Sequence, residues 1–348
     1  MKGFKKLIVW ALIPITLELV GFTYFNNFYL NNETSFNTKK VDLVSIKPTK
    51  INVNISDSAK NIGVSYNGNY ISYFENGVIN VVDTTNNNKK EINSDSSSAF
   101  SKYIWLPDRD IMLIAEKCVG NNGASYIKFQ SYNAKKNEKT ILSDQNNKQI
   151  NIHLNDSKSD VQDITLSTAT NVTYVQVGLK GTKSKIYRIN VMAQIESIQY
   201  VNCTLGNIAA TNNEDKLVYE DSTYNRIRVA GMKDVIATGE NATHYLLGTD
   251  NQDSIYIGNG ENNKVNKIFV VSLNKPRSQW KTIVLKKSAD KNNIYITRAG
   301  KIYINDLSTN SVLNLETGKE TNYKGIFVKL YDLGVISKDG GKLTGNLI

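Results

Sequence analysis

A short strand–turn–strand unit recurs, in degraded form, along nearly the whole chain after residue 50. The clearest copy is residues 103–117, YIWLPDRDIMLIAEK, in which two apolar runs flank the turn sequence PDRD. Proline presets the backbone dihedral of a turn, and aspartate favours turn positions. Another copy turns at Asn76 and Gly77, and Asn-Gly is the strongest short hairpin signal. We therefore predict a repeat of small sheets with four strands each.

The repeat predicts an all-β fold, a β-propeller formed by residues 50–348. Three or four short strands recur about every 35–50 residues. The predicted blades are residues 61–93, 103–143, 163–200, 206–237, 244–285, 293–315 and 326–347. The sixth unit has only a weak inner strand, expected within residues 286–289. Seven blades are favoured, and six are the alternative if the sixth unit merges with a neighbour. Two packed β-sandwiches would also give many short strands.

The last predicted blade reaches the end of the sequence after three strands. A propeller closes its ring when one blade takes strands from both ends of the chain. Residues 50–55, KINVNI, alternate between apolar and polar side chains as a half-buried strand does. We expect them to supply the missing fourth strand, because an open array of blades leaves exposed sheet edges.

The N-terminus has the composition of a membrane anchor. Three lysines in the first six residues precede residues 7–25, a run of about 19 residues with a single charge. As a helix this run is roughly 28 Å long, close to the thickness of the bilayer's hydrocarbon core. Lysines before the span predict a cytoplasmic N-terminus and a domain outside the cytoplasm. We expect residues 1–25 to form a stub and one transmembrane helix, and residues 26–49 a polar linker.

A cleaved signal peptide is the alternative interpretation of this run. The sequence GFTYF at its end is too bulky for a small-x-small cleavage site. We therefore expect an uncleaved signal-anchor that holds the protein at the cell membrane of a bacterial envelope, with a single span.

Glu18 is a candidate binding residue within the predicted span. A carboxylate there costs roughly 2.5–3.5 kcal/mol on insertion scales. Charges inside a membrane often mark functional contacts, so Glu18 would contact a partner helix. The alternative is that Glu18 is protonated or extends toward the interface, and the sequence leaves both open.

The formal net charge is +10, of which about +8 lies outside the N-terminal segment. The basic residues are scattered singly or in pairs, and no basic run carries interleaved aromatic residues. We therefore expect no nucleic-acid partner and a basic surface that faces an anionic envelope.

The chain has two histidines and two cysteines, and His244 is the candidate binding residue among them. His244 begins a predicted inner strand, so it either lines the axial channel or packs beside it. His153 lies near three aspartates, at positions 156, 160 and 163, which could ligate calcium but lack the spacing of an EF-hand. No metal site, cofactor or catalytic residue is predicted. Cys118 and Cys203 are far apart in sequence, and either a disulfide or two buried thiols is possible.

Two of the turns resemble those of the TolB-like and dipeptidyl-peptidase IV N-terminal-like propellers. The matching segments are residues 104–115, with the turn at Pro107 and Asp108, and residues 65–73, with the turn at Asn67 and Gly68. The resemblance implies the fold and no activity, because peptidases with such a propeller place catalysis in a separate hydrolase domain.

Propeller faces and channels are common binding surfaces, so we expect a binding or scaffold module. Its partner would be an envelope protein, a peptide or an anionic wall polymer. The alternative is a propeller enzyme that acts on polysaccharide, and a cluster of acids at the channel mouth would favour it. The sequence has no Gly-x-Ser-x-Gly motif, so a hydrolase of that class lacks its nucleophile.

Overall fold

The computed structural model describes residues 2–25, 51–179, 183–198 and 203–348. The chain divides into two units, Met1–Ile46 and Lys47–Ile348. The predicted linker, residues 26–49, lies outside the described residues.

The first unit contains one helix, α1 (Lys2–Tyr24), with Pro14 inside it. The helix exposes large apolar side chains such as Trp10 and Phe22, and it also carries Glu18. Within the described part of the chain, no helix is both long enough and apolar enough to cross a membrane. The expected transmembrane span at residues 7–25 is therefore not supported.

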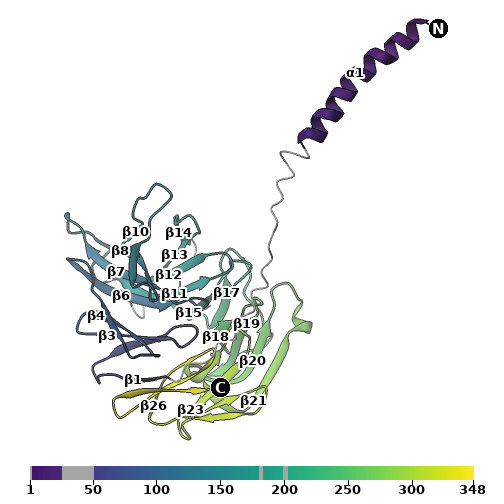
Figure 1. Cartoon of the computed structure of the whole chain (residues 1–348). Coiled ribbons are helices and arrows are strands. Elements are labelled where there is room, and N and C mark those ends of the chain that lie inside the picture. Colours follow the sequence, from purple (N-terminus) through teal and green to yellow (C-terminus); the bar gives the residue numbers. More distant parts are fainter. Residues whose placement is uncertain (1, 26–50, 180–182, 199–202) are drawn as a thin grey trace. The chain divides into compact units, whose positions relative to one another are not determined.

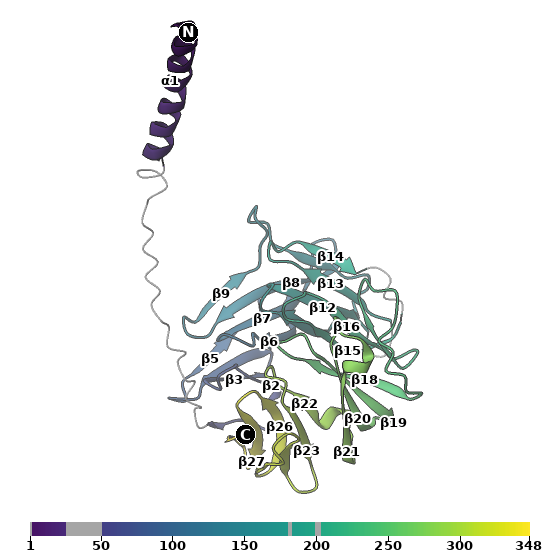
Figure 2. The same ribbon diagram turned by 90° about the vertical axis from the view of Figure 1, so that its right-hand side faces the viewer.

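The second unit consists of seven antiparallel sheets, which are the blades of a seven-bladed β-propeller. Figure 2 shows them following one another around the unit, from blue through green to yellow. Blade 1 consists of β2 (Lys60–Val64), β3 (Tyr70–Glu75), β4 (Val78–Asp83) and β5 (Lys89–Ile92). Blade 2 consists of β6 (Ser98–Trp105), β7 (Ile111–Val119), β8 (Ser125–Asn133), β9 (Glu138–Ile141) and β10 (Asn151–His153). Blade 3 consists of β11 (Asp160–Ser167), β12 (Val172–Gly178), β13 (Lys185–Ile189) and β14 (Ile195–Ile198).

Blades 4 to 7 complete the ring. Blade 4 consists of β15 (Leu205–Ala210), β16 (Leu217–Asp221) and β17 (Arg226–Val229), and blade 5 of β18 (Thr243–Thr249), β19 (Ile255–Glu261), β20 (Lys264–Val271) and β21 (Lys281–Asp290). Blade 6 consists of β22 (Ile294–Ile296), β23 (Ile302–Asp306), β24 (Ser311–Asn314) and β25 (Glu320–Asn322). Blade 7 consists of β26 (Ile326–Tyr331), β27 (Gly334–Asp339), β28 (Lys342–Leu347) and β1 (Asn52–Asn54). Two short 3₁₀ helices, η2 (Arg277–Gln279) and η3 (Lys291–Asn293), flank β21. The prediction of seven blades is confirmed.

The ring closes as the sequence predicted. β1 pairs antiparallel with β28, with Val53 opposite Leu343, so strands from both ends of the chain share blade 7 (Figure 1). Val53 and Leu343 are both buried in one apolar cluster with Ile71 of blade 1. The closing strand therefore covers a sheet edge and also packs against the first blade.

The sixth blade differs from the prediction. Residues 286–289 belong to β21, the outermost strand of blade 5, where Ala289 pairs with Val265. The inner strand of blade 6 is β22 instead. The prediction was wrong because β21 continues past the expected end of its blade, to Asp290, and because the outermost strand of blade 6, β25, lies beyond residue 315, the predicted end of the unit.

Asparagine in turns accounts for many of the tight connections. At the β3–β4 hairpin, Asn76 and Gly77 have φ values of 50° and 82°. Positive φ at both central residues is the requirement of a type I′ turn, which matches the twist of the two strands. Asparagine at such positions therefore has a structural use in this fold.

Apolar side chains fill the spaces between neighbouring blades. Ile114 of blade 2 packs with Ile79 of blade 1, and Phe129 of blade 2 packs with Val175 of blade 3. All four are essentially inaccessible to solvent. Each contributes about 1.5–3 kcal/mol by burial, so these seams hold the inner strands in fixed positions around the channel.

Candidate functional site

The first strand of each blade lines the centre of the ring. First strands of neighbouring blades contact one another, as β2 contacts both β6 and β26. The loop that follows each first strand lies at one face of the ring, which we call the turn face. In blades 2, 3, 5, 6 and 7 this loop contains Pro107, Thr168, Asn251, Arg298 and Asp332 respectively.

A cavity of about 500 Å³ opens at the inner ends of blades 1, 2 and 7. One wall is aromatic and its residues come mainly from blades 1 and 2: Tyr66, Phe74, Phe100, Tyr103 and Trp105, with Tyr331 from blade 7. The charged residues that line the cavity are Lys102, Asp163, Arg298, Lys329 and Asp332. The cavity thus combines apolar rings with cations, in the place where a propeller has its channel.

The aromatic wall is held rigidly in place. The Trp105 Nε1–H donates to Ser72 Oγ at 2.8 Å, and the ring stacks on Tyr70 with centroids 6.0 Å apart. Gly63 permits this arrangement, because a Cβ there would lie 2.6 Å from Ser72 Oγ and 3.1 Å from the Trp105 ring. The Tyr103 hydroxyl donates to the Asn61 carbonyl, and burial raises the pKa of Tyr103.

Three charged residues of the cavity each follow a β-bulge in a first strand. The register of pairing shifts just before Lys102, Asp163 and Lys329. A bulge inserts an unpaired residue and re-aims the side chains that follow it. The Lys102 Nζ lies 3.4 Å from Asp163 Oδ1 and donates to the Gln162 carbonyl at 3.0 Å.

Lys329 differs from Lys102 in its polar contacts. Among the described residues, no hydrogen bond or ion pair engages its ammonium group. The surrounding channel wall lowers the pKa of Lys329, the nearby charge of Lys102 lowers it further, and Asp163 acts in the opposite direction. Although protein surrounds Lys329, its side chain remains exposed to the cavity. This is the geometry of a cation that lines a solvent-filled channel.

Arg298 crosses the channel at the turn face. From blade 6 its guanidinium donates to the Pro107 carbonyl of blade 2 and, at 3.0 Å, to Thr168 Oγ1 of blade 3. In a ring of seven, blades 2 and 3 are the two that lie furthest from blade 6. The side chain must therefore span the channel axis.

Arg298 is also hydrogen-bonded to the two blades beside its own. Its Nε donates to Asn251 Oδ1 of blade 5 at 2.9 Å, and its backbone N–H donates to Asp332 Oδ1 of blade 7 at 3.1 Å. Arg298 thus connects five blades and closes part of one end of the channel.

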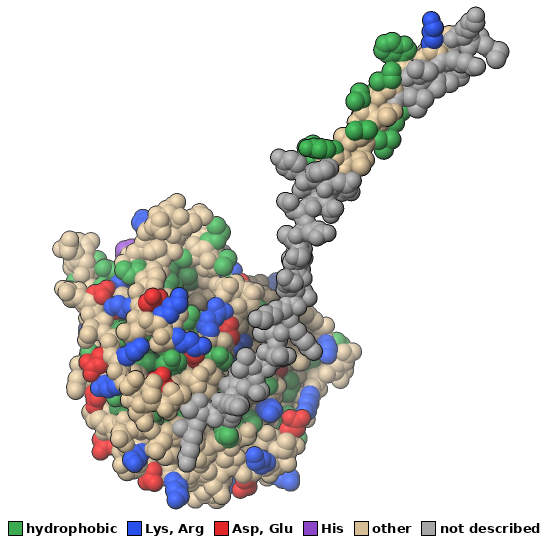
Figure 3. Space-filling model, in the orientation of Figure 1, with side chains coloured by type: hydrophobic (Ala, Val, Ile, Leu, Met, Phe, Trp, Pro, Cys, Tyr) green, Lys and Arg blue, Asp and Glu red, His purple; other side chains and the backbone are tan. Residues whose placement is uncertain are grey.

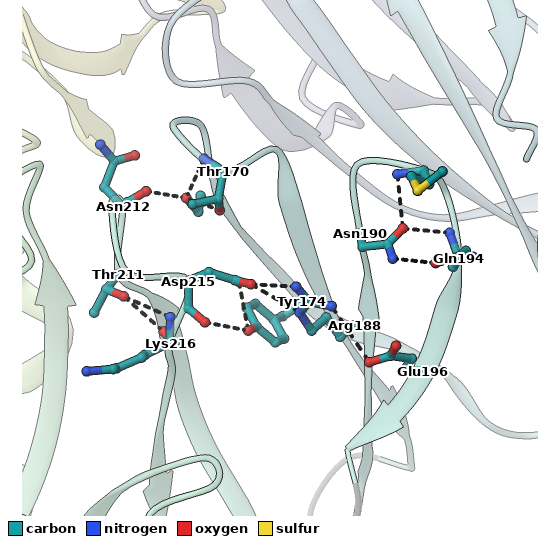
Figure 4. Close-up of polar contacts among 12 residues, drawn as sticks. Thr170, Tyr174, Arg188, Asn190, Gln194, Glu196, Thr211, Asn212, Asp215 and Lys216 are labelled. Atoms are coloured by element: carbon teal, nitrogen blue, oxygen red, sulfur yellow. Dashed lines mark hydrogen bonds and ion pairs between the residues drawn. The ribbon is translucent and has the colours of Figure 1, made fainter. Parts of the chain in front are cut away.

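A second polar cluster lies at the seam of blades 3 and 4 (Figure 4). Arg188 donates to Asp215 Oδ2 at 2.6 Å and lies 3.7 Å from Glu196 Oε2, while the Tyr174 hydroxyl donates to Asp215 Oδ1 at 2.9 Å. Both carboxylates therefore face the same guanidinium. The cluster is a satisfied ion-pair network that joins two blades, and it has no free acid or base.

The predicted site residue His244 lies outside the cavity lining. It is the second residue of β18 and is half-buried, and its Nε2 lies 2.5 Å from Thr238 Oγ1. Burial lowers the pKa of His244, and Glu240 opposes this shift. Glu18 is exposed on α1. No finding tests a binding role for either residue.

The aspartates around His153 have separate partners. Asp156 accepts from the Ser159 backbone, Asp160 accepts from the Ser101 hydroxyl, and Asp163 pairs with Lys102. No group of residues suited to hold a metal ion occurs in the described segments. Cys118 and Cys203 are both buried and free, so the thiol alternative is the one that the structure shows.

Sequence reasoning missed Lys102, Lys329 and Arg298. The only signal was a lone basic residue within or just after an apolar inner strand, as in KYIW and FVKLY. In the sequence, the lysines scattered elsewhere along the chain cannot be told apart from these residues. The surface does not single them out either, since basic and acidic side chains are interspersed on the propeller face in Figure 3.

Comparison with known proteins identifies the architecture. The β-propeller domain of Cps50 (Swd1) from Myceliophteria thermophila matches with a TM-score of 0.50 and 9% identity, over 86% of this chain and all of that one. This chain has the fold of a seven-bladed β-propeller. Hsv2 from Kluyvelomyces marxianus (TM-score 0.47, 10% identity, 81% and 88% covered) and the WD40 repeats of RRP9 (0.45, 9%, 70% and 71%) are similar at a lower level.

The likeness is one of fold alone. No protein-family model matches the sequence, and no curated protein matches it significantly. The resemblance to TolB-like and dipeptidyl-peptidase IV N-terminal-like propellers is therefore not supported as a family assignment. The propeller itself, which that resemblance also implied, is present.

Proposed function

We propose that the propeller is a binding module that takes a segment of an envelope protein or peptide into the channel cavity. The observation that carries the proposal is the cavity of about 500 Å³ with a fixed aromatic wall facing cations. Ligand sites are typically concave and mostly apolar, with a few polar groups that set orientation. Trp105 and Tyr103 supply the apolar surface here, and both are held by hydrogen bonds.

The charges of the cavity favour binding over glycoside hydrolysis. An enzyme acting on polysaccharide would need a pair of carboxylates free to exchange protons. The cavity contains Asp163 and Asp332, of which the first pairs with Lys102 and the second accepts the Arg298 backbone N–H. The described residues that line the cavity therefore do not form the acid cluster that would favour the polysaccharide enzyme.

We further propose that the module works outside the cytoplasm, attached to the cell membrane, with Glu18 as a contact for a partner helix. This proposal rests on the sequence alone: the lysines at the start of the chain and the apolar run at residues 7–25. An anionic wall polymer is the competing ligand, suggested by the basic net charge.

Binding to a displayed library of random peptides tests the proposed function. The full chain should select peptides, and Tyr66→Ala should weaken the binding of those peptides, because Tyr66 lines the cavity. Tyr224→Ala is the matched control, since Tyr224 is 65% exposed and lies outside the cavity lining. Equal weakening by both variants, or selection of a purified anionic wall polymer in place of peptides, would overturn the proposal.

A further inference from the structure

The positive charges of the cavity are unequally satisfied. Lys102 forms an ion pair with Asp163, and the Arg298 guanidinium donates hydrogen bonds to acceptors on blades 2, 3 and 5. Lys329 projects into the same cavity, and the described residues offer it no acceptor. A charged group surrounded by protein and without a direct hydrogen bond or ion pair is unfavourable, even with the carboxylate of Asp163 nearby. An anion that enters the cavity would supply what the chain does not.

We propose that Lys329 is the centre of an oxyanion site in the channel, with Lys102 as its second cation, and that the group it holds is a carboxylate of the bound segment. This inference rests on the proposed function, since it names the chemistry by which the same cavity recognises its ligand. An aspartate, a glutamate or a chain terminus would carry the carboxylate.

The position of Lys102 gives the site a way to adjust. Its ammonium lies 3.4 Å from Asp163 Oδ1, which is longer than a direct hydrogen bond, while its contact to the Gln162 carbonyl is 3.0 Å. An ammonium group has three donors, so Lys102 can bind an entering carboxylate and keep the Gln162 contact. Asp163 would then compete with the ligand for Lys102.

The charged groups around Lys329 set the pH dependence of binding. They are Lys102 and Asp163, with Arg298 and Asp332 further along the cavity wall. A bound anion stabilises the ammonium form, so binding raises the pKa of Lys329 toward its ordinary value. Affinity for the anion therefore falls as the pH rises through the lowered pKa of free Lys329.

Chemical labelling of lysines in the full chain tests the site directly. Acylating reagents attack the neutral amine, so Lys329 should be labelled faster than an ordinary exposed lysine near neutral pH. Acetate, at constant ionic strength set with chloride, should slow the labelling of Lys329, because a bound anion favours the ammonium form and so raises the lowered pKa of Lys329 toward its ordinary value. Lys286 is the internal control, because it is exposed on β21 and has no interaction among the described residues.

Variants separate the site from general charge effects. Lys329→Met should fold with an unchanged or higher melting temperature, since it removes an unpaired charge, and should lose the heat of acetate binding in calorimetry. Lys286→Met should keep that heat. Asp163→Asn should tighten acetate binding by removing the competitor for Lys102.

Each outcome decides the inference. Lys329 labelling unchanged by acetate, or a lower melting temperature of Lys329→Met, would overturn the oxyanion site. Protection by inorganic phosphate but not by acetate would overturn the choice of a carboxylate. If selected peptides still bind Lys329→Met as tightly as wild type while Tyr66→Ala weakens them, the anion site fails and the proposed function stands.

Discussion

Arg298 and Thr168 are joined across the channel, with Arg298 Nη2 donating to Thr168 Oγ1 at 3.0 Å although the residues belong to blades 6 and 3. Contacts in a propeller otherwise run mainly between neighbouring blades. This side chain therefore links opposite sides of the ring, and the chain positions it connects are 130 residues apart.

Removing the Arg298 side chain should loosen the whole ring. We expect Arg298→Ala to lower the free energy of unfolding by about 1.5–3 kcal/mol, the range for hydrogen bonds to charged groups. Arg298→Lys should recover little, because an ammonium cannot reproduce the planar fork of donors. Urea denaturation measures both changes.

Arg109→Ala is the control for this prediction. Arg109 is also on the turn face, but among the described residues its side chain bonds only to the adjacent Asp108. Arg109 is exposed and Asp108 is partly exposed, so loss of the pair should cost less than about 1 kcal/mol. A destabilisation of Arg298→Ala no larger than that of Arg109→Ala would show that the cross-channel contacts are not structural.

The closing strand gives a prediction with its control in the same element. In β1 the side chain of Val53 is buried and that of Asn52 is exposed. Val53→Asp should lower the free energy of unfolding by about 3–5 kcal/mol, because it buries an unpaired charge between blades 7 and 1. Asn52→Asp should stay within about 0.5 kcal/mol of wild type. Equal melting temperatures for the two variants would contradict closure of the ring by β1.

Protonation of His244 should lower the free energy of unfolding in acid. Its pKa is lowered below the ordinary 6.5 by burial, so the unfolded chain binds the proton more readily than the folded one. The stability present above pH 6.5 is therefore lost as the pH falls through the lowered pKa. His244→Gln, whose amide can replace the contact of Nε2 with Thr238, should remove this part of the loss. The check is thermal melting at about pH 7.5 and 5.5; an identical drop for variant and wild type would exclude His244 as a contributor.

The fold was largely predictable from sequence because its signals are local. Turn residues such as Asn76 and Gly77 act on their own backbone, and the alternation of residues 50–55 indicated the strand that closes the ring. The inner strand of blade 6 was misplaced because β25, the outermost strand of that blade, is only three residues long and was not recognised, so the fourth strand was sought before β22 instead. Periodicity fails for an element of three residues.

The candidate site was not predictable in the same way. Lys102 and Lys329 enter the cavity because a β-bulge precedes each of them, and these bulges have no distinct residue signature. Arg298 acts through partners on four other blades, which only the closed ring brings together. His244, chosen because it begins an inner strand, lies beside Thr238 instead of in the cavity lining.

The location of the protein is a prediction that a fusion can decide. A reporter that is active only outside the cytoplasm, fused after residue 50, should be active in growing cells if the lysines before residue 7 orient the chain as proposed. Replacing all three lysines with glutamate should lower this activity. Full activity of a cytoplasmic reporter at the same position would exclude the proposed location.

Photo-crosslinking in living cells tests the central claim, that the channel cavity is where the ligand binds. Benzoylphenylalanine in place of Tyr66, inside the cavity, should give a discrete crosslinked product, and the same residue in place of Tyr224, outside it, should give none. Addition of Lys329→Met should reduce the Tyr66 product. A product at position 224 with none at position 66 would contradict the account.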